Sequence, residues 1–214
     1  AATYSNMGLV IFGMGAYDEA LEQYQKALTM WLETFGPNHP NIAVCYHNMA
    51  NVYSKQGLYA QALMYYEKAL AILIQTLGAI HPEVAKNYNS IGQLYKYQKL
   101  YEEALMYHEK ALAIQLETFG PKHEEVAASY NNIGIVHHNQ RSYDKALDYY
   151  EKSIFSLLPL SQTNLDLNVS NPKILKHSLI NKIKLYFSRR APGDPASALA
   201  TIRYADRFID SLRT

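Results

Sequence analysis

The chain contains eight histidines, the side chains here that are best suited to metal binding or acid–base catalysis. His39, His81 and His123 recur at one constant interval, each beside the start of a predicted helix, too far apart to share one metal ion. His137 and His138 are neighbours, so their rings point to different faces of a helix. No His-Glu-x-x-His metal motif occurs among them. We therefore expect structural histidines, with no metal site and no catalytic residue.

Two further candidates for chemistry have simpler structural interpretations. His108 stands where the other repeats described below have a tyrosine, which predicts a hydrogen-bonded, partly buried imidazole. Cys45 is the only cysteine, so it cannot form an internal disulfide, and we expect a small packed side chain rather than a nucleophile. Gly13-Met14-Gly15 lacks the preceding strand and the following lysine of a phosphate-binding loop. We predict that the chain has no cofactor and is not an enzyme.

Charge and hydropathy argue against two classes of partner. The 20 lysines and arginines are balanced by 19 aspartates and glutamates, so no bulk attraction to nucleic acid or to an anionic membrane is expected. No apolar run approaches the roughly 18 residues of a membrane span, and the first residues do not resemble a signal peptide. The single cysteine fits a reducing compartment. We expect a cytoplasmic protein with no nucleic-acid or membrane partner.

A sequence repeat with one constant period positions all of these side chains. Its clearest column is a tyrosine, found at Tyr4, Tyr46, Tyr88 and Tyr130. Glycines and Ala-Leu pairs recur at the same period, at Gly36, Gly78 and Gly120 and at Ala20-Leu21, Ala62-Leu63, Ala104-Leu105 and Ala146-Leu147. So many columns at one period indicate an array of repeated structural units.

Each repeat is predicted to fold as two antiparallel helices. In the third repeat the buried face of the first helix comprises Tyr88, Ile91, Gly92 and Tyr95, and that of the second comprises Ala104, His108 and Ala111. A short turn at Gln98-Lys99-Leu100 joins them, and Gly57 at the corresponding place favours a left-handed helix stop. The next pairs are predicted to start at His39-Pro40 and His81-Pro82, because proline is tolerated in the first turn of a helix. We expect Gly92 and Ala104 to face each other.

These residues resemble the tetratricopeptide repeat, whose consensus has large and small side chains at the same spacing; only its final proline is absent. The longer period of this chain and its segment Leu77 to Ala85 resemble specifically the kinesin-light-chain-like variety of the repeat. The resemblance implies an all-α fold, a right-handed superhelical solenoid of about five antiparallel helix pairs. Residues 1–158 would form four of the pairs.

The repeat pattern breaks after Leu158. Residues 159–172 are predicted to form a connecting loop, and residues 173–214 a degenerate fifth helix pair that continues into a downstream domain. The segment from Asn171 resembles the junction that precedes a caspase-like CHAT peptidase domain in bacterial proteins. The last helix carries an exposed apolar stripe that would allow weak homodimerisation, formed by Ile202, Phe208, Ile209 and Leu212.

A second face of each first helix is predicted to bind a ligand. The predicted groove consists of His47, Asn51, Ser54, Lys86, Asn89, Gln93, Lys96, Asn131 and His138. It contains no carboxylate, so it offers hydrogen-bond donors to peptide carbonyls and a mildly positive surface for acidic groups. The alternative is an ordinary solvated face. Against it, the acidic residues concentrate on the second helices, at Glu67, Glu102, Glu103 and Glu109.

The sequence therefore predicts a module that binds a protein or peptide, with a preference for acidic ligands. One hypothesis is an adaptor or ligand-sensing region upstream of an effector such as a CHAT peptidase. The other is a motor-cargo or signalling scaffold of the kinesin-light-chain type without an effector. A His and Cys dyad downstream would favour the first hypothesis, and a coiled coil upstream would favour the second.

Overall fold

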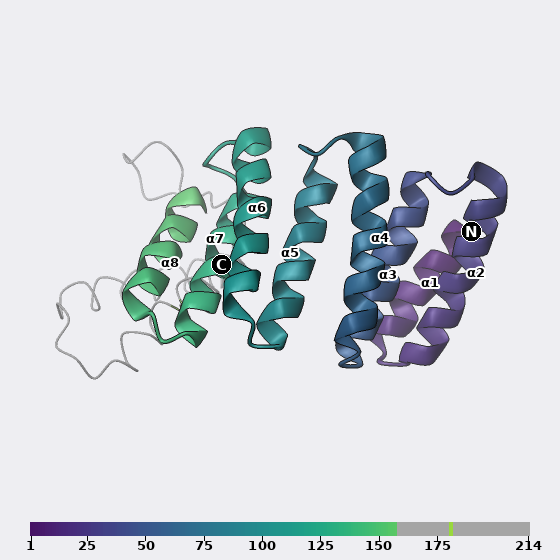
Figure 1. Cartoon of the computed structure of the whole chain (residues 1–214), viewed down its shortest axis with the longest axis horizontal. Coiled ribbons are helices and arrows are strands. Elements are labelled where there is room, and N and C mark those ends of the chain that lie inside the picture. The colour runs from purple at the N-terminus through teal and green to yellow at the C-terminus, as the bar shows by residue number, and fades with distance from the viewer. Residues whose placement is uncertain (158–179, 182–214) are drawn as a thin grey trace, which may run out of the picture. The chain divides into compact units, whose positions relative to one another are not determined.

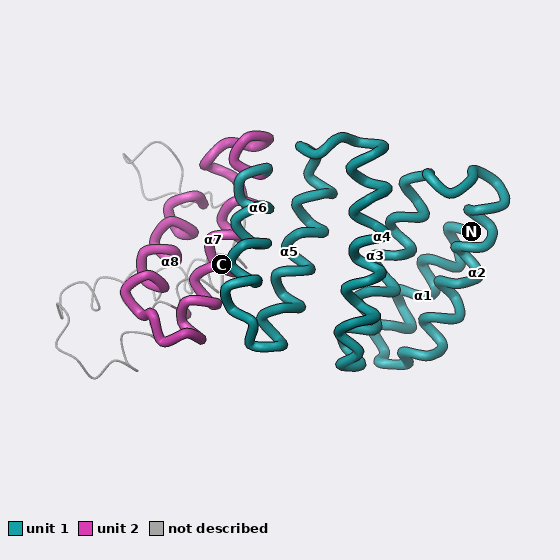
Figure 2. Tube along the Cα trace, viewed as in Figure 1, with its two compact units in different colours: residues 1–114 teal, residues 115–214 magenta. Residues whose placement is uncertain are grey.

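The structure, a computed structural model, describes residues 1–157 and 180–181. Residues 1–157 form eight α-helices and no strand (Figure 1). The helices are α1 (Ala2–Gly13), α2 (Tyr17–Phe35), α3 (Pro40–Lys55), α4 (Tyr59–Leu77), α5 (Pro82–Tyr97), α6 (Tyr101–Phe119), α7 (Glu124–Asn139) and α8 (Tyr143–Leu157). The chain divides into two compact units, Ala1–Ile114 and Gln115–Thr214, which are described separately below (Figure 2).

Several predictions for the C-terminal part concern residues that are not described. The predicted loop at 159–172 and the predicted fifth pair at 173–214 lie outside the described residues, apart from Ile180 and Asn181. The apolar stripe of the last predicted helix also lies outside them. Its proposed role in weak homodimerisation stays a prediction.

Three of the histidines that recur in the sequence cap the first helices of their pairs. The Nδ1 atoms of His39, His81 and His123 accept hydrogen bonds from the backbone N–H two residues ahead, at 3.2, 3.1 and 3.2 Å. Each bond satisfies one of the N–H groups that the first turn of a helix leaves unpaired. Pro40 and Pro82 follow two of the caps, where the missing N–H costs nothing. The structural interpretation of these histidines is confirmed.

A residue in the left-handed region ends the turn within every helix pair. Gly15, Gly57, Lys99 and Arg141 occupy the same column of the repeat and have φ angles of 83°, 78°, 62° and 62°. In this conformation the Cβ of an ordinary residue crowds its own carbonyl, so two of the four pairs use glycine. The predicted left-handed stop at Gly57 is confirmed, and the third pair makes the same turn with a lysine.

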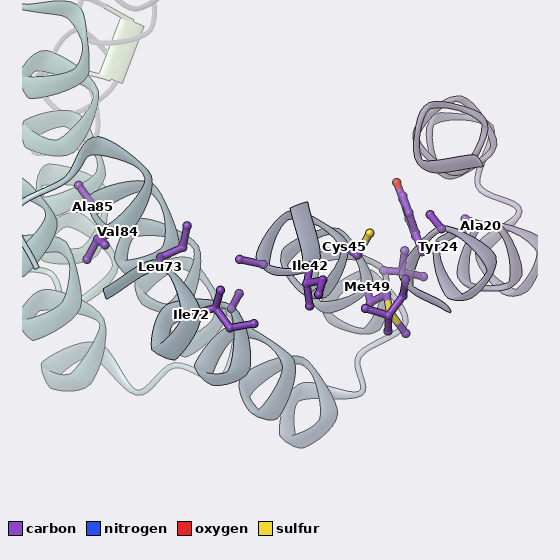
Figure 3. Packing of buried hydrophobic residues seen from close by; sticks show 14 of the residues in the cluster. Ala20, Tyr24, Ile42, Cys45, Met49, Ile72, Leu73, Val84 and Ala85 are labelled. Atoms are coloured by element: carbon purple, nitrogen blue, oxygen red, sulfur yellow. The ribbon is translucent and has the colours of Figure 1, made fainter. Parts of the chain in front are cut away.

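The core of the first unit alternates between first and second helices. Figure 3 shows Tyr24 of α2 close to Cys45 and Met49 of α3, and Ile72 and Leu73 of α4 on the side towards Val84 and Ala85 of α5. All of these side chains are buried. In the first unit, α3 and α5 therefore each pack against the second helix of the preceding pair.

The glycines of the first helices admit large rings from the second helices. A Cβ placed on Gly92 would lie 2.9 Å from the His108 ring, and one on Gly8 would lie 2.7 Å from the Tyr24 ring. The predicted partner of Gly92 was Ala104, which is buried, but the atoms nearest to Gly92 belong to His108 instead. The ring, four residues further along α6, is long enough to fill the space that the missing Cβ leaves.

Half-buried tyrosines and a lysine form the same cluster on the second and third pairs. Tyr107 stacks on Tyr95 with ring centroids 5.4 Å apart, and Lys110 Nζ lies 5.1 Å from the Tyr107 centroid and 5.7 Å from that of Tyr88. The second pair repeats this arrangement with Tyr53, Tyr65, Tyr46 and Lys68. Each cation over a ring contributes about 0.5–1 kcal/mol where it is exposed. These contacts join the two helices of a pair and stabilise their packing.

Candidate functional site

The first-helix face of the first unit is the candidate site. It is defined by His47, Asn51 and Ser54 on α3 and by Lys86, Asn89, Gln93 and Lys96 on α5. Lys86 is exposed and the other six side chains are half-buried. Asn131 and His138 occupy the corresponding positions of α7, and they belong to the second unit.

A small hollow lies at one end of this face. It has a volume of about 40 Å³ and is lined by Ala43, Val44, His47, Asn48, Leu73, Glu83 and Lys86. Two predicted groove residues, His47 and Lys86, are thus brought together by α3 and α5. Lys86 Nζ lies 3.6 Å from Glu83 Oε2, so a carboxylate reaches this surface. The sequence analysis missed Glu83 because its series of positions began at Lys86, one turn later.

The His47 ring is neutral at physiological pH. Desolvation lowers the pKa of His47 to about 4, and the nearby Lys86 ammonium lowers it in the same direction. Its Nδ1 lies 3.5 Å from the Nδ2 of Asn87, and its ring meets the Tyr66 ring edge-on at 5.4 Å. Asn87 is fully buried, and its Oδ1 has no hydrogen-bond partner among the described residues. His47 therefore offers the hollow an uncharged ring.

Asparagines on the first-helix face are held by buried rings from the second helices. The hydroxyl of Tyr66 donates to Asn51 Oδ1 at 2.6 Å. In the next pair, Nδ1 of His108 lies 2.8 Å from Asn89 Oδ1, and since that oxygen can only accept, Nδ1 carries the proton. Both amides are thereby fixed with their oxygens towards the second helix.

His108 is more deeply buried than its sequence predicted. The expectation was a partly buried, fully bonded imidazole, but the side chain is completely buried and its Nε2 has no partner among the described residues. Desolvation lowers the pKa of His108 to about 3, and the charge of Lys96 acts in the same direction. Burial also lowers the pKa of Lys96, whose Nζ lies 5.5 Å from the Tyr97 centroid. The imidazole is thus neutral, with one defined tautomer.

In the second unit, the corresponding face of α7 is partly enclosed. Asn131 is buried, and its Oδ1 accepts a hydrogen bond from Asn181 Nδ2 at 3.2 Å. His138 is half-buried, with its ring 5.8 Å from that of Tyr143. His137 is buried and stacks on Tyr149 at 5.3 Å, in the column where the second and third repeats have Tyr53 and Tyr95. Of these residues, Asn131 and His138 were predicted for the groove.

The described residues contain no group of three or more His, Cys, Asp or Glu side chains that could hold a metal ion. Cys45 is buried, and desolvation raises the pKa of its thiol to about 11, which fits a packed side chain. In the described part of the chain, no helix has both the length and the apolar character needed to cross a membrane.

The sequence analysis missed the residues that support the predicted groove. His108 was predicted to lie on the buried face of its helix, but the bonds from Tyr66 to Asn51 and from His108 to Asn89 were not foreseen. Asn87 was missed altogether. A signal was available, because the repeat has a buried polar or small side chain at this column, found as Cys45, Asn87 and Ser129.

Comparison with known proteins identifies the repeat. The tetratricopeptide repeat family matches residues 1–75 and 83–154, which is more than half of the chain. No curated protein sequence matches.

Solved structures show the same fold. BtubC (BKLC) from P. vanneervenii aligns with a TM-score of 0.80 and 23% identity, over 98% of this chain and 80% of that protein. A putative kinesin light chain from Podosopora anserina, with nearly identical TPR-like repeats, gives 0.74 and 18% over 96% and 94%. The apo form of RapI gives 0.73 and 18% over 97% of this chain and 53% of RapI. The predicted all-α solenoid of tetratricopeptide type, similar in structure to kinesin-light-chain-like proteins, is confirmed.

Proposed function

We propose, from the premise that the chain belongs to the tetratricopeptide repeat family, that it binds a peptide segment of another protein along its first-helix face. Proteins built from this repeat are in general scaffolds for protein interaction. The groove, its ligand and its place in a larger protein are the parts that this proposal adds.

The observation that supports the proposal most directly is the polar chemistry of the face on α3 and α5. Fixed amides at Asn51 and Asn89 lie on the same two helices as a hollow that contains a neutral histidine. Directed hydrogen-bonding groups beside apolar side chains are what an extended peptide backbone requires.

A preference for acidic ligands is the finer part of the proposal. Lys86 and Lys96 supply two positive charges on this face, and Glu83 pairs with Lys86 and offsets one of them. The remaining charge sits on Lys96, which is half-buried beside Tyr97. A carboxylate of the ligand would compensate for the hydration that the Lys96 ammonium loses on burial.

The wider role remains a choice between two proposals. An adaptor or sensing region upstream of a CHAT-type effector rests on the resemblance of residues 171–214, most of which lie outside the described residues. The structural likeness to a putative kinesin light chain favours the scaffold alternative. A downstream His and Cys dyad would support the effector, whereas further repeats would support the scaffold. The cytoplasmic location stays a prediction.

The first-helix face can be tested with a displayed library of random peptides. The double variant Asn89→Ala, Lys96→Ala should lose the peptides that the natural sequence selects. The matched control is Asn38→Ala, Lys145→Ala, which changes an exposed asparagine and an exposed lysine away from the face. Selected peptides should be rich in Asp, Glu or free carboxyl termini. Equal selection by both variants, or no selection at all, would contradict the proposed groove.

A further inference from the structure

The second and third helix pairs use different rings at one position of the repeat. Tyr66 on α4 and His108 on α6 occupy the same column of the repeat, and both are buried. Each ring bonds to the amide oxygen of an asparagine on the first helix of its own pair. The positions of the rings are equivalent, and so is the chemistry of the bonds.

The asparagines they reach are not equivalent. Asn51 on α3 corresponds to Gln93 on α5, and Asn89 on α5 corresponds to His47 on α3. The longer tyrosine reaches the later of the two positions, while the shorter histidine reaches the earlier one. The two positions are four residues apart, about one turn or roughly 6 Å along a helix.

The polarity of these bonds decides what the amides can offer. An amide has an oxygen that only accepts and a nitrogen that only donates. Since the ring donor engages the oxygen, the amide turns its N–H groups away from the ring. In the second unit the Asn131 oxygen also accepts a hydrogen bond, but its donor is Asn181 Nδ2 and not a ring of the second helix.

We infer that Tyr66 and His108 are positioning residues that choose which asparagine of the first-helix face is fixed as a hydrogen-bond donor. The ring type thereby sets where along each helix a ligand must supply a carbonyl or carboxylate oxygen. The inference about the ligand rests on the proposed function, whereas the anchoring of the amides does not. In the second pair the tyrosine places the donor on the later turn of the first helix, and in the third pair the histidine places it on the earlier turn.

The anchoring is tested without any ligand by ¹⁵N nuclear magnetic resonance of the histidine rings and side-chain amides. His108 should be neutral with its proton on Nδ1. In the variant His108→Tyr the Gln93 amide resonances should shift, because the hydroxyl would reach the later position, and the Asn89 amide should lose its ring partner. The natural Tyr66 pair is the model for this exchange. A proton on Nε2 of His108, or unchanged Gln93 amide resonances in the variant, would overturn the inference.

The donor role is tested with peptides recovered from the random library. Asn89→Asp keeps an oxygen for the His108 N–H but replaces the amide N–H groups with a second oxygen. Its affinity should fall about tenfold or more, and further than that of Asn89→Ala, because the ligand acceptor would then meet an acceptor. Asn38→Asp makes the same charge change at an exposed loop residue and should leave the affinity unchanged.

Neutral versions of the same peptides identify the acceptor. With Glu and Asp replaced by amides and the carboxyl terminus amidated, only carbonyl oxygens remain. If the Asn89→Asp loss persists with these peptides, the acceptor is a backbone or amide carbonyl; if it disappears, the acceptor is a carboxylate. Equal binding by Asn89→Asp and the natural sequence for every peptide would refute the donor role. Failure to recover any peptide would contradict the proposed function and leave the magnetic resonance result to decide the anchoring.

Discussion

The first helix of the chain and the first helices of the next two pairs have the same apolar pattern but bury it differently. Met7 and Val10 of α1 are 45% and 59% exposed. Their counterparts on α3, Met49 and Val52, are 3% and 0% exposed. Met49 lies in a cluster with Tyr24 and with Ala27 and Leu28 of α2, the second helix of the preceding pair. Burial at these positions therefore comes from a neighbouring pair, and α1 faces none among the described residues.

The comparison shows which apolar surfaces a single helix pair buries by itself and which it does not. The two helices of a pair bury the surface between them, which we call the inner seam; Gly8 of α1, for example, packs against Tyr24 of α2. The pair does not cover the outer side of its first helix, which needs the second helix of the preceding pair. The predictions below separate these two contributions.

The largest effect is expected where the outer side is covered. Ile91→Ala removes a fully buried side chain and should destabilise the protein by about 2–5 kcal/mol. Met7→Ala at the equivalent position of α1 should change the unfolding free energy by no more than about 0.5 kcal/mol, since Met7 is exposed. Urea unfolding of both variants measures the difference. Similar losses would mean that α1 is buried in solution.

A fall in pH should lower the free energy of unfolding through His108 of the third pair, whereas the first pair has no histidine at this position. The folded pKa of His108 is about 3, below its ordinary value of 6.5, so the stability it contributes is complete above 6.5 and falls as the pH drops towards 3. The loss is about 2 kcal/mol at pH 5. The first pair has Tyr24 at this position, and His108→Tyr should therefore flatten the dependence. Thermal unfolding between pH 7 and pH 5 tests this; an equally steep variant would rule it out. His47, with a pKa of about 4, contributes in the same direction in both proteins.

A smaller effect is expected at the inner seam. Gly92→Ala should destabilise by about 1–3 kcal/mol, because its Cβ would lie 2.9 Å from the His108 ring. Gly13→Ala, with nothing within 4 Å of its Cβ, should stabilise α1 by about 0.5–1 kcal/mol through helix propensity alone. Melting temperatures measure both. A stabilised Gly92→Ala variant would show that the ring moves aside freely, since the second pair already packs Ala50 and Tyr66 at these two positions.

The smallest differences should occur at the turns, where the first and second pairs have the same geometry. Gly15→Ala and Gly57→Ala place an ordinary residue at φ angles of 83° and 78°. Each should cost about 1 kcal/mol, and the two costs should agree despite the different burial of α1 and α3. Chemical denaturation gives both values. Unequal costs would indicate that packing against neighbours also stabilises the turn.

Much of the fold was predictable because the spacing of residues along the sequence specifies the helices locally. The His-Pro starts and the stop at Gly57 each specify a local backbone state, and helices begin and end beside these signals. The column of Tyr4 and Tyr46 lies within the first helices and marks the repeat period. The face that holds Asn89 and Lys96 was also readable from helical spacing. Its use as a binding groove remains a proposal.

What the sequence alone determined is the alternation of helix and turn, because caps, left-handed residues and amphipathic spacing act within a few residues of the chain. Only the tertiary structure decided which side chains support the face. Whether Tyr66 reaches Asn51 and His108 reaches Asn89 depends on the length of each ring and on how closely two helices approach, quantities set by packing between separate helices. The same is true of Met7 and Met49, whose identical residue types differ in burial because, among the described residues, a second helix packs on the outer side of Met49 and none packs on that of Met7.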